Sequence, residues 1–330
     1  MYVKLQGHIE IHRQDRRKLS FDAFNSVEIE KDIFNIKSSC KIKIPISSRL
    51  EHKATGQTES VQTAKQFSRG DKIHISLGYS GRLYKEFTGF IYRLNYKTPL
   101  EIECEGYEYQ LRRPCETKTW ASTSMKEVLE FLIKGTDIKL SEDVPEIKFP
   151  KFIIPANMTR LEALQMVKDK YGVAIFFIDN LLYAGLAYTL DRGTVKYKLG
   201  WNTIKDDSLK YRNADDVSLK IKAVWIKPDN TKLEAQVGDP SGSLRTLFFY
   251  NVSSKAELEK LGKEEIKKYK YSGYEGKITT FLEPFAQPGM KGELSDPKYS
   301  ERDGTYYITK VNVKADTSGG RRTVEFTVKL

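Results

Sequence analysis

The sequence predicts a mainly β protein with an α+β insert, in which two β units flank a small α+β domain. Apolar and polar residues alternate with a period of two near both ends of the chain, as in strands that are wet on one face. Between these regions the period becomes that of amphipathic helices. Of all residues, 12% are aromatic, mostly Tyr and Phe, which favour strands. The expected domains are residues 1–114, 115–200 and 201–330.

The first β unit is predicted as an antiparallel meander or barrel. Strands are expected over 40–46, 71–79, 87–96 and 99–111, each marked by alternating apolar residues and punctuated by Gly or Pro. In the first of these, four apolar residues share one face with lysines opposite. The four apolar residues are Cys40, Ile42, Ile44 and Ile46.

A long polar stretch, residues 47–69, interrupts this unit with almost no apolar periodicity. Loops of this length are uncommon inside compact domains and are usually functional or disordered. We expect an arm or loop that becomes ordered against a neighbouring molecule. A mobile surface insertion is the alternative.

The insert is predicted to contain two helices and a hairpin. Ser124 with Glu127, and Thr159 with Glu162, have the spacing of capping boxes at the two helix starts. Gly135 and Gly172 are the expected stops. Two short apolar strands then surround Asp179 and Asn180, which are typical turn residues. The first helix should bury Met125, Val128, Leu129, Leu132 and Ile133.

The last third returns to strands, predicted over 215–226, 243–252, 304–315 and 321–330. Turns are expected at 228–231 and 316–320. A helix between the second and third of these strands should start at a Ser254 and Glu257 capping box, bury Leu258, Leu261, Ile266 and Tyr269, and close at Gly273. Pro288 and Gly289 should turn the chain into a charged, flexible excursion that ends at Gly304. No repeat of 20–50 residues is evident.

Charge and cysteine content restrict the function. The net charge of +11, from 55 basic and 44 acidic residues, favours solubility or attraction to nucleic acid, but no nucleic-acid-reading motif accompanies it. The cysteines, Cys40, Cys104 and Cys115, form no C-x-x-C pair, so we expect reduced thiols and neither a disulfide framework nor a zinc knuckle. The start resembles no secretion signal, and no apolar run is long enough to span a membrane, so folding in a cytoplasm is expected.

The residues that could carry chemistry form no constellation. The histidines are His8, His12, His52 and His74; the first two should lie on the wet face of one strand without a third metal ligand. Paired carboxylates occur in polar, lysine-rich contexts that do not raise a pKa for catalysis; they are Asp206–Asp207, Asp215–Asp216 and Glu264–Glu265. No nucleophile elbow or phosphate loop is present. The sequence therefore predicts no catalytic, metal or cofactor site.

Segments from 69 to 79 and from 85 to 113 resemble the first barrel of the tail hub proteins of contractile phages, the late control protein D group, which is related to the hub of the type VI secretion spike. That family opens a strand with Gly-Asp, ends it with Gly-Tyr, begins the next with Phe-x-Gly and reaches a Leu-Arg pair. The matching residues are Gly70, Asp71, Gly78, Tyr79, Phe87, Gly89, Leu111 and Arg112. The helices and hairpin of the insert, and the 288–308 segment, are similar to later parts of the same family.

The resemblance implies two tail-tube-like β-barrel domains in each chain and a homotrimer that forms a pseudo-sixfold ring. Such a ring joins a sixfold tail tube protein to a threefold spike, in a virion tail or baseplate assembled in the bacterial host cytoplasm. Nucleic acid would at most pass through its lumen, and the tape-measure protein is a further candidate partner. Because the chain ends after its last strand, the spike and any wall-degrading activity are expected on separate polypeptides. The loops 47–69 and 288–304 are the expected contacts.

Two other functions remain open. Barrel domains with Tyr and Phe between lysines could bind single-stranded nucleic acid by stacking. An unrecognised carboxylate pair could degrade cell wall.

Overall fold

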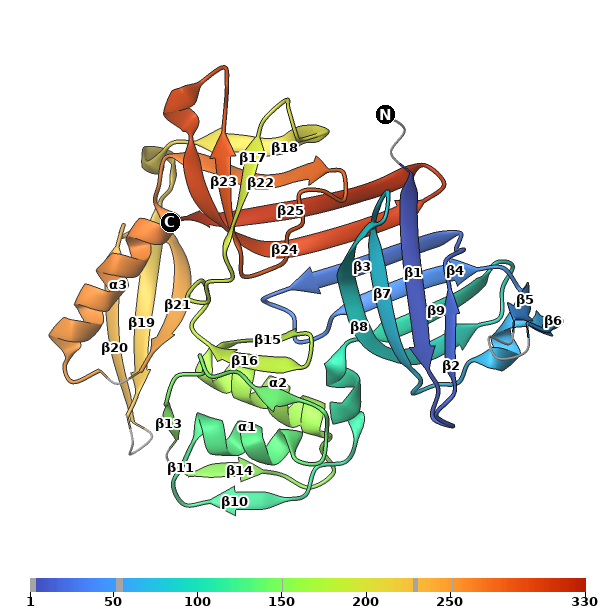
Figure 1. The fold of residues 1–330 in the computed structure, drawn as a ribbon. Helices are drawn as coiled ribbons and strands as arrows, with labels where there is room; N and C mark the ends of the chain where they lie inside the picture. Colours follow the sequence, from blue (N-terminus) through green and yellow to red (C-terminus); the bar gives the residue numbers. More distant parts are fainter. Residues whose placement is uncertain (1–3, 52–55, 150, 228–230, 251) are drawn as a thin grey trace.

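The computed structural model describes residues 4–51, 56–149, 151–227, 231–250 and 252–330. His52, the centre of the 47–69 stretch and most of the expected turn at 228–231 lie outside these ranges. The mainly β prediction is confirmed, because one large sheet dominates the molecule (Figure 1). None of the described helices is long and apolar enough to cross a membrane.

Among the described residues the main sheet has 13 strands in the order β18-β22-β25-β24-β3-β4-β9-β8-β7-β1-β2, with β23 and then β17 attached beside β24. Its strands are β1 (Leu5–His12), β2 (Lys18–Phe21), β3 (Ser26–Asp32), β4 (Ser39–Ile44), β7 (Lys72–Tyr79), β8 (Arg82–Asn95), β9 (Leu100–Glu105), β17 (Thr194–Lys198), β18 (Lys205–Arg212), β22 (Gly273–Thr280), β23 (Lys291–Ser295), β24 (Gly304–Asp316) and β25 (Gly319–Lys329).

The expected pair of separate closed barrels is not what the described strands form. β2 does not pair with β3, and β17 does not pair with β18, so neither β unit closes on itself. Instead β3 pairs with β24, in a register that runs from Ser26 opposite Asp316 to Asp32 opposite Lys310. The physical reason is the length of β24: its first residues pair with β23, and the remainder offers a free edge that β3 fills. The two β units thereby share one continuous wall.

Both β units have the same strand order, which no simple period in the sequence indicates. The first unit runs β1-β7-β8-β9-β4-β3, and the second runs β17-β23-β24-β25-β22-β18. In each, the first strand meets a three-stranded meander, and the last meander strand pairs with the strand that precedes the meander. One pairing differs, because β1 and β7 are antiparallel whereas β17 and β23 are parallel.

The insert matches its prediction closely. Helix α1 (Met125–Ile133) starts at the Ser124 capping box, and α2 (Arg160–Tyr171) starts at the Thr159 box. Gly172, with φ of 61°, caps α2 as expected, and Gly135, with φ of 74°, follows the C-cap residue Lys134 and ends α1 as expected. The hairpin of β15 (Ala174–Ile178) and β16 (Leu181–Gly185) turns at Asp179 and Asn180. Short strands complete the insert: β10 (Lys118–Trp120), β11 (Thr123–Ser124), β12 (Lys139–Leu140), β13 (Lys148–Phe149) and β14 (Phe152–Ile154).

A separate lobe interrupts the second β unit between β18 and β22, which the sequence did not indicate. It contains β19 (Leu219–Ile226), β20 (Lys232–Gly238), β21 (Ser243–Phe249) and α3 (Lys255–Tyr269). β19 pairs in parallel with β21 and antiparallel with β20, and among the described residues these three strands form a sheet separate from the wall. The third capping box is only half formed, because the Glu257 carboxylate accepts from the Ser253 amide instead of the Ser254 amide. Gly273 starts β22 rather than closing the helix.

Both segments expected to be irregular contain strands. Within 47–69 the described residues form two paired strands, β5 (Ser47–Glu51) and β6 (Thr58–Gln62), followed by a short 3₁₀ helix (Thr63–Gln66); we call β5 and β6 the arm. The arm projects from the body beside β4 and β9 (Figure 1). The expected flexible excursion contains β23 and a 3₁₀ turn (Ser300–Arg302).

Three hydrophobic clusters make up the core of the part of the chain that the structure describes. The first fills the inner face of the wall and draws on both β units, the second fills the insert, and the third lies between the lobe, the hairpin β15–β16 and the wall. Alternation predicts the buried faces well, except at two strand ends. Ile46 and Leu330 continue the apolar pattern but are each 50% exposed.

Candidate assembly surfaces

His8 and His12 lie on the wet face of β1, as predicted, and His74 lies on the neighbouring strand β7. The His8 ring bonds to Asp22, while His12 contacts Glu10 and lies edge-on to His74 with ring centroids 5.0 Å apart. Within the described ranges, no group of three His, Cys, Asp or Glu side chains is placed to hold a metal ion.

The paired carboxylates are solvent-facing where the structure describes them. Asp215, Asp216 and Glu264 are exposed, and Glu265 forms an ion pair with Lys268. The side chains of Asp206 and Asp207 lie outside the described part. A glycosidase acid needs an apolar pocket that raises its pKa, and none of the described pairs has one.

Two of the three cysteines face each other across the sheet. Cys40 on β4 and Cys104 on β9 are register partners, both buried and both free thiols. Burial raises the pKa of both thiols. They act as small hydrophobic side chains, as the strand pattern predicts.

A buried ion pair joins the two β units inside the wall. Arg322 on β25 is fully buried, and its guanidinium contacts both oxygens of the Glu86 carboxylate on β8, at 2.5 and 3.3 Å. It also donates to the carbonyls of Leu282 and Ala286. An arginine suits this site because its guanidinium has five N–H donors, and each of these bonds satisfies a buried acceptor.

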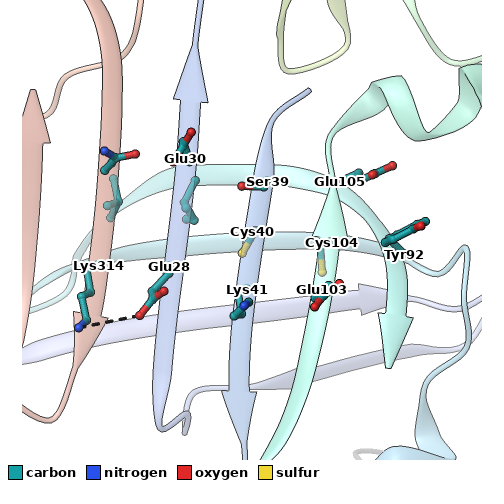
Figure 2. Close-up of a pocket in the computed structure, with 13 residues that line it drawn as sticks. Glu28, Glu30, Ser39, Cys40, Lys41, Tyr92, Glu103, Cys104, Glu105 and Lys314 are labelled. Atoms are coloured by element: carbon teal, nitrogen blue, oxygen red, sulfur yellow. Dashed lines mark ion pairs between the residues drawn. The ribbon is translucent and has the colours of Figure 1, made fainter. Parts of the chain in front are cut away.

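The outer face of the wall, over β24, β3, β4, β9 and β8, carries alternating charge. From β24 to β9, successive strands present Lys314, Glu28, Lys41 and Glu103. These side chains surround a shallow hollow of about 540 Å³ (Figure 2). Figure 2 shows Lys314 directed toward Glu28, with Lys41 and Glu103 on the next strands. We call this surface the polar face.

Most charges of the polar face have a partner on the next strand. Ion pairs cross between the described strands or from the wall to the 3₁₀ turn that follows β9, at N···O distances from 2.5 to 4.0 Å. They include Lys310–Glu30, Lys314–Glu28, Lys41–Glu101, Lys43–Glu101, Arg93–Glu103 and Arg112–Glu105. Each exposed pair stabilises little. Together they leave a hydrated surface without a strong field of one sign.

A second 3₁₀ helix (Tyr107–Arg112) follows β9 and buries a carboxyl group. Glu108 accepts from the backbone amides of Ser38 and Gly106 through one oxygen, at 2.8 Å each, and its other oxygen has no partner. Because burial disfavours the charged form, the pKa of Glu108 is raised to about 8.

Two projecting features present side chains to solvent, which are mostly polar on the arm and aromatic on two turns of the second β unit. The arm exposes most of its side chains. At the opposite end of the wall, the turn after β17 holds Trp201 at 82% exposure, and the turn after β23 holds Tyr299, with the Arg302 guanidinium over its ring. Trp, Tyr and Arg are enriched where proteins bind one another.

The two β units also correspond residue by residue at their meanders. Ile91 on β8 exchanges backbone bonds with Gly70 and Asp71, and Ile308 on β24 does the same with Gly289 and Met290. Both strands then have a register shift at the same place, after Ile91 and after Ile308. The pairs that follow correspond as well: Arg93–Glu103 with Lys310–Glu325, and Asn95–Glu101 with Asn312–Thr323.

This correspondence leaves a sequence signal that pattern reading missed. Ile-x-Arg-Leu-Asn at 91–95 and Ile-x-Lys-Val-Asn at 308–312 are the same motif in chemical terms. It was overlooked because the copies lie far apart along the chain, much farther than the 20–50 residues of common repeats.

Comparisons with known proteins place the fold. The chain is similar to a 43 kDa prophage tail protein from Shewanella oneidensis, with a TM-score of 0.62 and 13% identity over 99% of this chain and 98% of that one. A tail protein from Neisseria meningitidis gives a TM-score of 0.61 and 13% identity over 98% and 96% of the two chains. An Escherichia coli component of the type VI secretion system gives 0.56 and 9% identity over 99% and 77%.

No family model matches the chain, and no curated protein sequence matches it either. At these identities the likeness establishes a shared fold, and that fold is found in prophage tail proteins and in type VI secretion components, as the sequence resemblance implied.

Proposed function

We propose that this chain is a structural tail hub of a prophage or a related contractile particle. Three copies would form a ring that joins the tail tube to a spike. One observation carries this proposal: the chain builds two β units of the same strand order into one continuous wall. Three such chains present six similar units, which can match sixfold symmetry on one side and threefold symmetry on the other.

In this proposal residues 1–114 and 201–330 hold the two tube-like barrel domains, each completed when neighbours cover its open seam. β17 (Thr194–Lys198) joins the second domain, and the lobe stands apart from its wall. Free edges are a liability for a solitary chain, and assembly would cover them. The arm and the exposed turns that carry Trp201 and Tyr299 would contact a neighbouring subunit or the tube.

The polar face suits the wall of a passage for nucleic acid. Its lysines are matched by carboxylates, so it lacks the continuous positive strip with which proteins hold phosphates. The tail tube protein, a separate spike protein and the tape-measure protein are the proposed partners, in a virion baseplate assembled in the host cytoplasm.

The test is the solution mass of the purified chain by light scattering at several concentrations, with negative-stain micrographs of the same sample. The proposal predicts a mass three times that of the 38.0 kDa chain and annular particles. A single copy at every concentration, or an open filament, would contradict it.

A further inference from the structure

The same strand contact exists twice in this chain, once filled and once empty. Within the chain, β3 of the first unit pairs with the part of β24 that extends beyond β23. By strand order, β18 corresponds to β3 and β8 corresponds to β24. The empty contact therefore consists of β18 and the part of β8 that extends beyond β7.

The pairing of the described residues confirms that both edges are free. β18 pairs only with β22. On β8, the register with β7 ends at Phe90, and residues after the Ile91 register shift pair only with β9. β18 is the last strand at its end of the wall, whereas β8 lies inside the other unit, so the two edges belong to opposite parts of one chain.

We propose that β18 of one copy pairs, antiparallel, with residues 92–95 on β8 of the next copy. The partner is thus a second copy of this chain, and the inference rests on the proposed ring. The register follows from the filled contact, where Asp32 lies opposite Lys310 and Glu30 lies opposite Asn312. Arg93 and Asn95 on β8 correspond to Lys310 and Asn312 on β24, and Arg212 and Lys210 on β18 correspond to Asp32 and Glu30 on β3. The expected register therefore sets Arg212 opposite Arg93 and Lys210 opposite Asn95.

Exposure at the empty contact supports this pairing. Tyr96, which follows β8, is 78% exposed, whereas its counterpart Val313 is 3% exposed beneath the β3–β24 pairing. Leu209 on β18 is half-buried, whereas its counterpart Ile29 is 3% exposed. In the proposed register Tyr96 lies opposite Leu209, so each would cover the other.

The filled contact opposes unlike charges, whereas the proposed contact opposes like charges. Lys310 lies opposite Asp32 in the filled contact, and Arg93 would lie opposite Arg212 in the proposed one. Each arginine has its own carboxylate, Glu103 at 3.9 Å and Glu275 at 2.7 Å. Like charges directly opposite each other weaken a strand pair, so the contact between chains is weaker than its counterpart within the chain.

Site-specific disulfide formation tests the register. Asn95→Cys with Lys210→Cys, in a Cys115→Ser background, places two thiols at directly opposite positions, where Cβ atoms are about 5 Å apart. Mild oxidation should give chains linked in twos and threes on a non-reducing gel. The control, Tyr96→Cys with Lys210→Cys, is shifted by one residue, which points the two thiols to opposite faces, and should stay unlinked.

The outcomes separate the contact from the ring. A trimer by light scattering without linkage of the matched pair overturns the contact and leaves the ring intact. A monomer by light scattering overturns the ring, and the contact with it.

A third readout is Arg93→Glu, which places a carboxylate opposite Arg212. It should lower the dissociation constant of the trimer about two- to fivefold, and no change or a weaker trimer would count against the register.

Discussion

Arg322 and Glu86 join the two β units from inside the wall, at a depth where an unpaired charge is costly. Arg322→Met should lower the free energy of unfolding by about 3–5 kcal/mol, because it leaves the Glu86 carboxylate buried without its partner. Urea denaturation measures the change. The double variant Arg322→Met with Glu86→Gln removes both charges and should recover part of the loss. A single variant as stable as the native chain would contradict this account of the junction.

Glu108 should make the chain less stable as the pH rises. Its pKa is raised from 4.5 to about 8, so between these values the unfolded chain releases a proton that the folded chain retains. The free energy of unfolding then falls by up to about 1.4 kcal/mol for each pH unit in this window. Glu108→Gln should remove most of that slope.

Unfolding midpoints at pH 5, 6, 7 and 8 would measure the Glu108 effect (values chosen to span roughly the window between the two pKa values). Glu142→Gln is the matched control, since Glu142 is exposed and its substitution should leave the slope unchanged. Equal slopes in Glu108→Gln and the native chain would show that another group is responsible.

At the scale of elements, the arm can be removed without disturbing the wall. The Thr63 amide donates to the Ile46 carbonyl at 2.9 Å, so the base of the hairpin is already closed. Replacing residues 47–62 by a Gly-Gly turn should change the thermal midpoint of the monomer little, because the arm contributes no residue to the hydrophobic core clusters. If the arm contacts a neighbour, the same deletion should weaken the trimer at least tenfold by light scattering at decreasing concentration. If the trimer were equally stable without the arm, the arm would make no contact between subunits.

Elements whose signal is local were predictable from the sequence. Alternation located the strands around Cys40, Ile73 and Val324, and capping boxes located α1 and α2 to the residue. The arm was missed because its strands bury no face, so polar residues alternate with one another. The sequence predicted strands and a helix in the lobe but not that they form a separate sheet, because the parallel pairing of β19 with β21 depends on contacts that periodicity does not encode.

For the whole molecule, the sequence predicted two β units around an insert but not how the units meet. The pairing of β3 with β24 depends on β24 being longer than β23, and no composition or period reveals which edge will be filled. The same limit applies to the candidate surfaces. The exposed Tyr96 and the free edge of β18 have meaning only once their filled counterparts, Val313 and β3, are known.

The central claim is that two equivalent units in one chain let three copies close into a pseudo-sixfold ring. The most direct measurement is the rotational symmetry of end-on particle images from electron microscopy. The account predicts annular particles with six similar densities, alternating in detail so that only threefold symmetry is exact. Rings of six identical chains, closed dimers or the absence of any ring would contradict it.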